Sequence, residues 1–160
     1  MGGFPKTVKN LSRFTNLLAG VSLSFIMFLT VLDVILRFFR KPIVGTYELV
    51  GFAGAVVIGF ALPLTSWDRA QIYVDFFLEK LPKTGRSLMH LFTRGLSIAL
   101  FAALGWNLIR IAMDYQRTGE VSSTLQLPFY PVAYGLGVVC FLQCLVLVCH
   151  VLNVLGGKYE

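Results

Sequence analysis

Charged residues are scarce in this chain of 160 residues: Asp, Glu, Lys and Arg make up 14% of it, whereas 56% of the residues are hydrophobic. A soluble domain usually carries about 25% charged residues, so the composition argues against a soluble domain. The net charge of +6 comes from Lys and Arg scattered at the ends of apolar runs. These basic residues form no continuous face in which aromatic residues between them could stack on bases. We therefore expect no nucleic-acid binding. We expect a membrane protein, oriented by its Lys and Arg residues.

Motifs of several common catalytic sites are missing as well. The chain has no phosphate-binding glycine loop of the Walker type, no His-Glu-x-x-His zinc motif and no Gly-x-Ser-x-Gly nucleophile elbow. The three cysteines all fall in the last apolar run, where we interpret them as small buried residues. His90 and His150 leave open a haem subunit of the b-type cytochrome kind, since two histidines can ligate a haem. We expect no enzyme, with no catalytic, cofactor-binding or metal-binding residues.

Four apolar runs are long enough to cross a bilayer, which takes about 20 helical residues. We predict a single integral membrane domain over residues 1–160, all-α, with spans at about 14–37, 46–67, 87–113 and 129–155. The first span follows a short basic segment and is expected to be an uncleaved signal anchor. An even number of spans puts both termini on one side, and the larger share of Lys and Arg there predicts that the termini are cytoplasmic.

The most polar stretch of the chain lies between the second and third spans. Its apolar residues recur at i, i+3, i+4 and i+7, which is the pattern of an amphipathic helix: Val74, Phe77, Leu78 and Leu81. We predict a short amphipathic arm over about 73–81 that lies in the membrane interface. An ordinary connecting helix packed on protein is the alternative.

Ionisable residues gather at the ends of the spans that lie opposite the termini. Asp33 and Arg37 are spaced to pair along one helix, and Glu48, at the start of the second span, could reach Arg37 or Arg110. A charge network that fixes helix packing is our main interpretation. A proton or ion relay and a contact with a partner protein are the alternatives. No span carries an acid near mid-membrane, which argues against a relay and against a stand-alone proton-coupled transporter.

Other polar and small residues within the spans suggest helix contacts. Gly51, Ala55 and Gly59 recur every four positions in the second span, a spacing that lets another helix approach closely. In the third span, Arg94 is expected to extend back to the interface or to pair with an acid on a neighbour. In the fourth span, Gln143 is expected to hydrogen-bond across helices.

Several short motifs occur in a recognisable order along the chain. They are Asp33-Val34-x-x-Arg37-Phe38, Gly45-Thr46-Tyr47-Glu48-Leu49, Ile72-Tyr73-Val74-Asp75, and Ser123-Thr124-Leu125-Gln126-Leu127-Pro128. In this order the chain resembles the small membrane subunit, Q or DctQ-like, of tripartite ATP-independent periplasmic (TRAP) transporters. A structural or assembly subunit of an unrelated membrane complex is the alternative.

The resemblance implies a multi-pass subunit of the bacterial inner membrane that carries out no catalysis. It would form a heterodimer with a large membrane subunit that binds the substrate and Na⁺. It would pack against the static scaffold of that subunit and widen this scaffold in the bilayer. A periplasmic binding protein would deliver an organic acid and touch the complex transiently, with membrane lipids as further partners. On this resemblance the small-residue face would pack against the large subunit or within the chain, and the arm would brace the scaffold. Selection of the organic acid would lie in the other chains.

Overall fold

Four long α-helices make up most of the computed structural model, which describes residues 3–68 and 83–155. They are α1 (Gly3–Phe38), α2 (Thr46–Trp67), α4 (Lys83–Thr118) and α5 (Tyr130–Leu155). Each contains a stretch that is long and apolar enough to cross a membrane. The predicted all-α membrane protein with four spans is therefore confirmed. The predicted arm, with Val74, Phe77, Leu78 and Leu81, lies outside the described residues.

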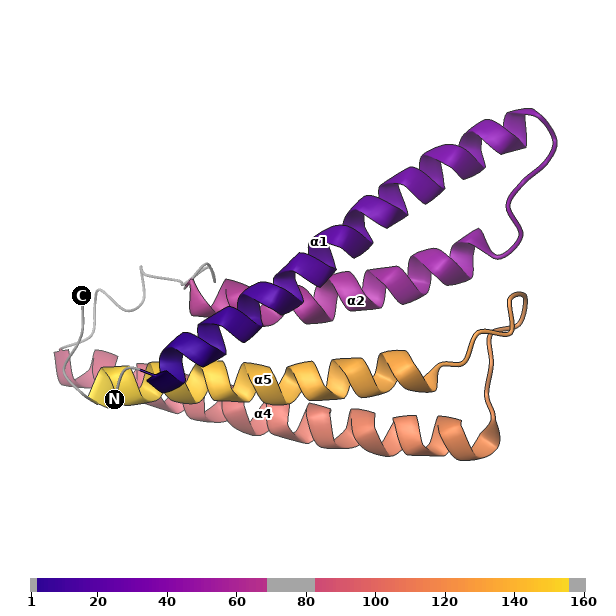
Figure 1. The fold of residues 1–160 in the computed structure, drawn as a ribbon. Coiled ribbons are helices and arrows are strands. Elements are labelled where there is room, and N and C mark those ends of the chain that lie inside the picture. The colour runs from indigo at the N-terminus through magenta and orange to yellow at the C-terminus, as the bar shows by residue number, and fades with distance from the viewer. Residues whose placement is uncertain (1–2, 69–82, 156–160) are drawn as a thin grey trace.

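The four helices run alternately up and down in sequence order (Figure 1). Segments 39–45 and 119–129 lie together at one end, which we call the loop end. The start of α1 and the end of α5 lie at the opposite end, which we call the terminal end. α1 and α4 are both 36 residues long, or about 54 Å. They exceed the ~30 Å hydrocarbon core of a bilayer, so each helix must tilt or extend beyond it.

α5 is the central helix of the bundle. In its most apolar window 44% of the residues are buried, against 11% in each of the other three helices. α4 lies alongside α5, and Figure 1 shows α1 crossing α2 and moving away from α5 toward the loop end. At the terminal end, Val8 of α1 packs with Leu142, Val146 and Cys149 of α5, and Trp67 of α2 covers this cluster. The first helix is thus anchored to the central helix near its own start.

Glycines set the close approach of α4 and α5. A Cβ atom on Gly137 would lie 2.9 Å from Cγ1 of Ile109, and one on Gly105 would lie 3.2 Å from the Cβ of Cys140. Such contacts leave no room for a side chain, so both helices use a small residue at the crossing.

A buried polar contact joins α2 to α5: the Gln143 side-chain amide donates to the Ser66 hydroxyl oxygen at 2.6 Å. The predicted cross-helix hydrogen bond of Gln143 is confirmed.

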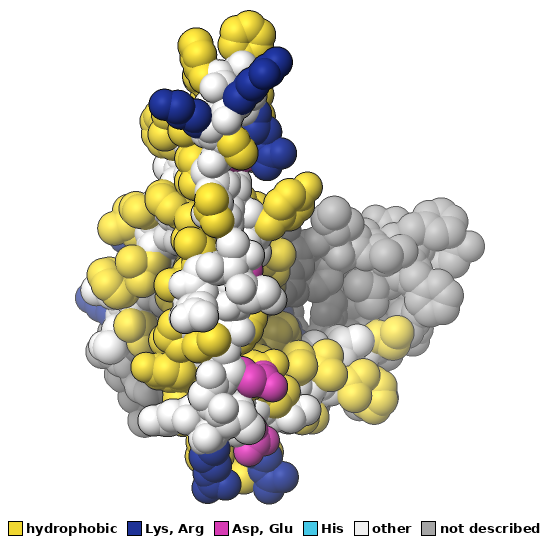
Figure 2. All heavy atoms as spheres, turned by 90° about the vertical axis from the view of Figure 1, so that its right-hand side faces the viewer, with side chains coloured by type: hydrophobic (Ala, Val, Ile, Leu, Met, Phe, Trp, Pro, Cys, Tyr) yellow, Lys and Arg dark blue, Asp and Glu magenta, His cyan; other side chains and the backbone are white. Residues whose placement is uncertain are grey.

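Apolar side chains cover much of the outside of the bundle. Seen from the loop end, hydrophobic side chains surround the helices, and Lys and Arg side chains lie at both extremes of the view (Figure 2). On α1 alone, Phe28 is 72% exposed, Val34 64% and Met27 63%. An apolar surface of this extent is typical of contact with lipid or with another membrane protein.

Candidate functional site at the loop end

The end of α1 is closed by a tight turn of the backbone. The amide of Arg40 donates to the carbonyl oxygen of Arg37 at 3.0 Å, and the amide of Lys41 donates to that of Leu36 at 2.9 Å. These two bonds form a Schellman motif, in which one residue takes the left-handed conformation that glycine usually supplies. Here that residue is Arg40, with φ at 57°. The helix therefore ends at a fixed angle, and segment 39–45 leaves it in a defined direction.

Asp33 fixes the path of segment 39–45. Its carboxyl group is buried, with only 4% of the residue exposed. One oxygen accepts from Nε of Arg37 at 2.7 Å, and the other accepts from the backbone amide of Ile43 at 2.9 Å. The hydroxyl of Thr46, the first residue of α2, donates to the carbonyl oxygen of Ile43 at 3.0 Å. The Asp33–Arg37 ion pair predicted from the spacing is present, and the same carboxylate also holds the connection to α2.

Glu48 joins the two connecting segments of the loop end. Its Oε1 accepts from the backbone amide of Thr124 at 2.8 Å, and its Oε2 accepts from that of Leu125 at 2.9 Å. The Leu125 side chain lies where a Cβ on Gly45 would be, and Gly45 has a φ of 81°. A residue with a side chain at that position would therefore meet both backbone strain and a steric clash. Glu48 and Gly45 together dock segment 119–129 onto the start of α2.

Segment 119–129 is itself held in a compact turn. The amide of Ser122 donates to the carbonyl oxygen of Leu127 at 2.9 Å, and that of Gln126 donates to the carbonyl oxygen of Ser122 at 3.1 Å. These bonds present the amides of Thr124 and Leu125 side by side toward Glu48. A carboxylate that accepts two backbone amides makes charge-assisted hydrogen bonds, which are stronger than neutral ones.

The predicted network of four charges is divided in the structure. Asp33 and Arg37 form a pair, whereas Glu48 binds backbone amides of another segment. Arg110 lies over the Trp106 ring, with its guanidinium carbon 5.4 Å from the ring centroid. Sequence reasoning missed Thr124 and Leu125 as partners of Glu48. Glu48 and its two partners lie in two of the short motifs, but a backbone donor carries no side-chain signature that would link them.

An open cavity of about 560 Å³ lies beside Glu48, between α2, α4 and α5. Gly51 and Ala55 line it from α2, and a Cβ on Gly51 would meet no atom within 4 Å. Gly59 differs from them, because it packs directly against the side chain of Leu136 on α5. The predicted small-residue face thus has one contact within the chain and two positions that face unfilled space.

The histidines and cysteines considered for a metal or a haem lie on α4 and α5. Within residues 3–68 and 83–155, no group of three or more His, Cys, Asp and Glu is placed to hold a metal ion. The His150 ring lies against Trp67, with the ring centroids 5.9 Å apart. The side chain of His90 lies outside the described ones.

The fold and the loop end define a multi-pass α-helical membrane protein in which the carboxylates of Asp33 and Glu48 hold the connecting segments together. The family model described as "Tripartite ATP-independent periplasmic transporters, DctQ component" matches residues 26–157. The chain belongs to this family, which confirms the resemblance seen in its motifs and sets aside a subunit of an unrelated complex. The family is one of transporter components and not of enzymes. No curated protein and no solved structure gives a significant match.

Proposed function

We propose that this TRAP transporter component is the scaffold partner of a large membrane subunit in the sodium-driven uptake of an organic acid. The observation that carries the proposal is the match of the DctQ component model over residues 26–157. A tripartite system implies two further proteins, which we take to be a large membrane subunit and a periplasmic binding protein. The large subunit would bind the organic acid and Na⁺, and the binding protein would deliver the organic acid.

The charged groups of the loop end support a scaffold role in place of ion transport. Asp33 and Glu48 each accept from backbone amides, so their charges are used to position the connecting segments. Both lie at the loop end of their helices, so an ion path across the membrane would need other ligands. We therefore assign Na⁺ binding to the large subunit.

The open cavity beside Glu48 is our candidate contact for the large subunit. Gly51 and Ala55 allow close approach of a helix, and nothing within the described chain fills the space above Gly51. The exposed apolar side chains of α1 extend the surface that lipid or a membrane partner can cover. The subunit would thus widen the scaffold in the bilayer.

We further propose that the protein lies in the bacterial inner membrane with its termini in the cytoplasm. This orientation follows from the larger share of Lys and Arg on the terminal side. It puts segments 39–45 and 119–129 on the periplasmic side, where the binding protein would meet the complex. Tyr47, which is 86% exposed, is available there for such a contact.

Co-purification tests the proposal. The tagged chain, expressed with the large membrane protein encoded beside it, should retain that protein in mild detergent. Gly51→Leu should lower the retained amount about tenfold, because overpacking a close helix contact costs about 1–3 kcal/mol. Gly20→Leu is the matched control, since a Cβ on Gly20 also meets nothing within 4 Å but lies on α1. A chain that runs alone would contradict the proposal. Equal retention of the large membrane protein by both variants would contradict the assigned contact at Gly51.

A further inference from the structure

The end of α1 carries two aromatic side chains followed by two basic ones, and all four are exposed. Phe38 is 85% exposed and Phe39 65%, and their rings meet edge to face with the centroids 5.7 Å apart. Arg40 and Lys41 follow directly and are exposed as well. We call these four residues the α1 tip. Figure 1 shows α1 standing apart from α5 at this end, so the described chain leaves the α1 tip uncovered.

The α1 tip carries positive charge that the described chain does not neutralise. The acid on the same helix end is Asp33, whose carboxylate is buried and already pairs with Arg37. Within the described part of the chain, neither Arg40 nor Lys41 forms an ion pair. Figure 2 shows Lys and Arg among hydrophobic side chains at its upper extreme, where α1 ends, while the Asp and Glu side chains in plain view lie toward the lower extreme. The α1 tip therefore fits an anionic partner.

The two flanking helices fix the depth of the α1 tip in a bilayer. The membrane-spanning segment of α1 ends at Phe38 and that of α2 begins at Thr46, and the short connection 39–45 joins them. Arg40 is two residues beyond Phe38, so its backbone lies at most about 7 Å from the end of the span. The headgroup region extends about 5–8 Å beyond the hydrocarbon core on each side. Arg40 therefore lies at the level of the lipid phosphate groups.

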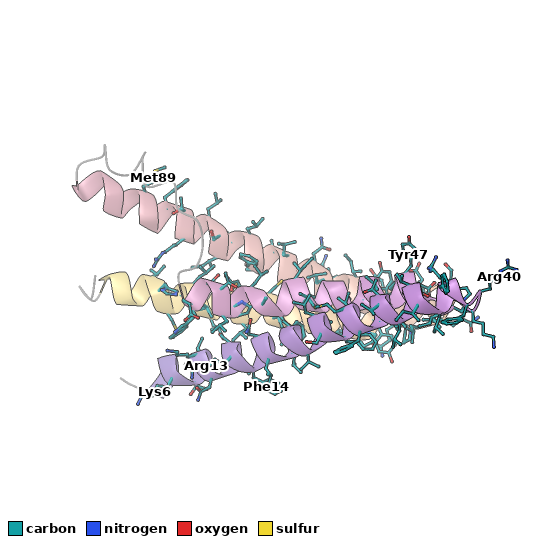
Figure 3. All side chains as sticks on the ribbon, turned by 90° about the horizontal axis from the view of Figure 1, so that it is seen from above. Lys6, Arg13, Phe14, Arg40, Tyr47 and Met89 are labelled. Carbon is teal, nitrogen blue, oxygen red and sulfur yellow. The ribbon has the colours of Figure 1, made fainter. Side chains whose placement is uncertain are left out.

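The backbone at Arg40 points to a role for its side chain. Its φ of 57° is left-handed, which is unfavourable for a residue with a Cβ atom, and glycine is the usual residue at this place in a Schellman motif. The turn itself is closed by backbone hydrogen bonds that glycine would also make. Figure 3 shows Arg40 at the extreme loop end of the bundle, further out than Tyr47. The guanidinium thus has its use outside the turn.

We propose that the α1 tip binds the phosphate groups of anionic phospholipids in the leaflet at the loop end. A guanidinium presents a fixed fork of donors that suits two phosphate oxygens at once, and Lys41 adds a second charge. The phenyl rings of Phe38 and Phe39 would lie at the boundary between headgroups and acyl chains, where amphipathic segments place their apolar residues. A lipid leaflet supplies both chemistries at this depth, whereas an acidic face of a soluble protein would match the cations alone. The proposal holds whichever side of the membrane the loop end faces.

Photocrosslinking tests the proposal on the full chain, purified with the subunits it retains. The photoreactive residue p-benzoylphenylalanine takes the place of Phe39, and in a control chain it takes the place of Phe28, which is exposed in the apolar part of α1. Each complex is reconstituted in liposomes of equal parts phosphatidylglycerol and phosphatidylethanolamine, the binding protein is added, and the products are identified by mass spectrometry. The ratio of phosphatidylglycerol to phosphatidylethanolamine crosslinked at position 39 should be at least about fivefold that at position 28, the expected effect of one basic residue at an anionic surface.

Charge removal tests which residues produce this preference. Arg40→Gln combined with Lys41→Gln should bring the ratio at position 39 down to that at position 28. Arg117→Gln is the matched control, because Arg117 is an exposed arginine at the end of α4, and it should leave the ratio unchanged. Arg40→Gly should lower the ratio while raising the melting temperature in detergent, a combination that a purely structural role of Arg40 would not give.

Three results would overturn the proposal. A protein as the main product at position 39 would assign the α1 tip to that protein, whether the large subunit or the binding protein. Equal lipid ratios at positions 39 and 28 would show no preference for an anionic headgroup. An equal loss in Arg117→Gln and in the Arg40 and Lys41 variants would show an effect of overall charge. Arg40→Gly decides the role of Arg40 if the double variant fails to fold.

Discussion

Replacing Glu48 with Gln tests whether one carboxylate holds the loop end together. In the structure its two oxygens accept from the amides of Thr124 and Leu125 at 2.8 and 2.9 Å. A Gln side chain keeps one acceptor oxygen but turns an NH₂ group toward the second amide, so two donors would face each other. At least one charge-assisted bond is lost, and one amide is left without its acceptor.

The structure allows the size of this effect to be worked out. A hydrogen bond to a charged group changes an equilibrium by a factor of about 10 to 100. Local opening of segment 119–129 should therefore become at least about tenfold more frequent in Glu48→Gln. The opening should be local, because α4 and α5 keep their contacts at Gly105 and Gly137.

Hydrogen exchange of the Thr124 and Leu125 amides measures this opening directly. Both amides should exchange at least about tenfold faster in Glu48→Gln than in the wild type, while amides in the middle of α5 stay protected. Glu120→Gln is the control, because it changes an exposed acid of the same segment. Unchanged exchange in Glu48→Gln, or the same increase in Glu120→Gln, would show that the Glu48 carboxylate does not hold these two amides.

Three further substitutions test other parts of the structure. Asp33→Asn should speed exchange of the Ile43 amide about tenfold, because that amide loses its charged acceptor; unchanged exchange would contradict this. Gln143→Leu should lower the free energy of unfolding by about 1 kcal/mol through loss of the bond to Ser66, and a thermal melt in detergent that matches the wild type would count against it. Arg40→Gly should raise the melting temperature, since glycine removes a left-handed strain of about 1 kcal/mol, and a lower value would show that the Arg40 side chain makes a contact that matters more.

The helices and the i, i+4 ion pair could be predicted because both depend on local sequence. An apolar run of sufficient length becomes a membrane-spanning helix almost wherever it occurs, and α2 (Thr46–Trp67) contains the apolar run that starts at Leu49. Asp33 and Arg37 lie on one face of one helix, so their contact follows from the helical repeat.

The partners of Glu48 depended on the path of a distant segment. These partners are backbone amides that lie 76 and 77 residues further along the chain. Every residue except proline has such a donor, so the sequence does not single them out. The small-residue spacing also had two readings that only packing could separate. Gly59 meets Leu136, whereas Gly51 and Ala55 face the open cavity. Spacing predicts that a close contact is possible, and the positions of the other helices decide which glycine makes it.

The scaffold role can be measured most directly by transport in proteoliposomes. The large membrane subunit and the binding protein would be reconstituted with and without this chain, and uptake of the organic acid would be followed under a sodium gradient. We predict that uptake requires the chain, and that Glu48→Gln lowers the yield of the complex while leaving the sodium dependence of uptake per complex unchanged. Full uptake by the large subunit alone, or a normal yield with altered sodium dependence in Glu48→Gln, would contradict the account.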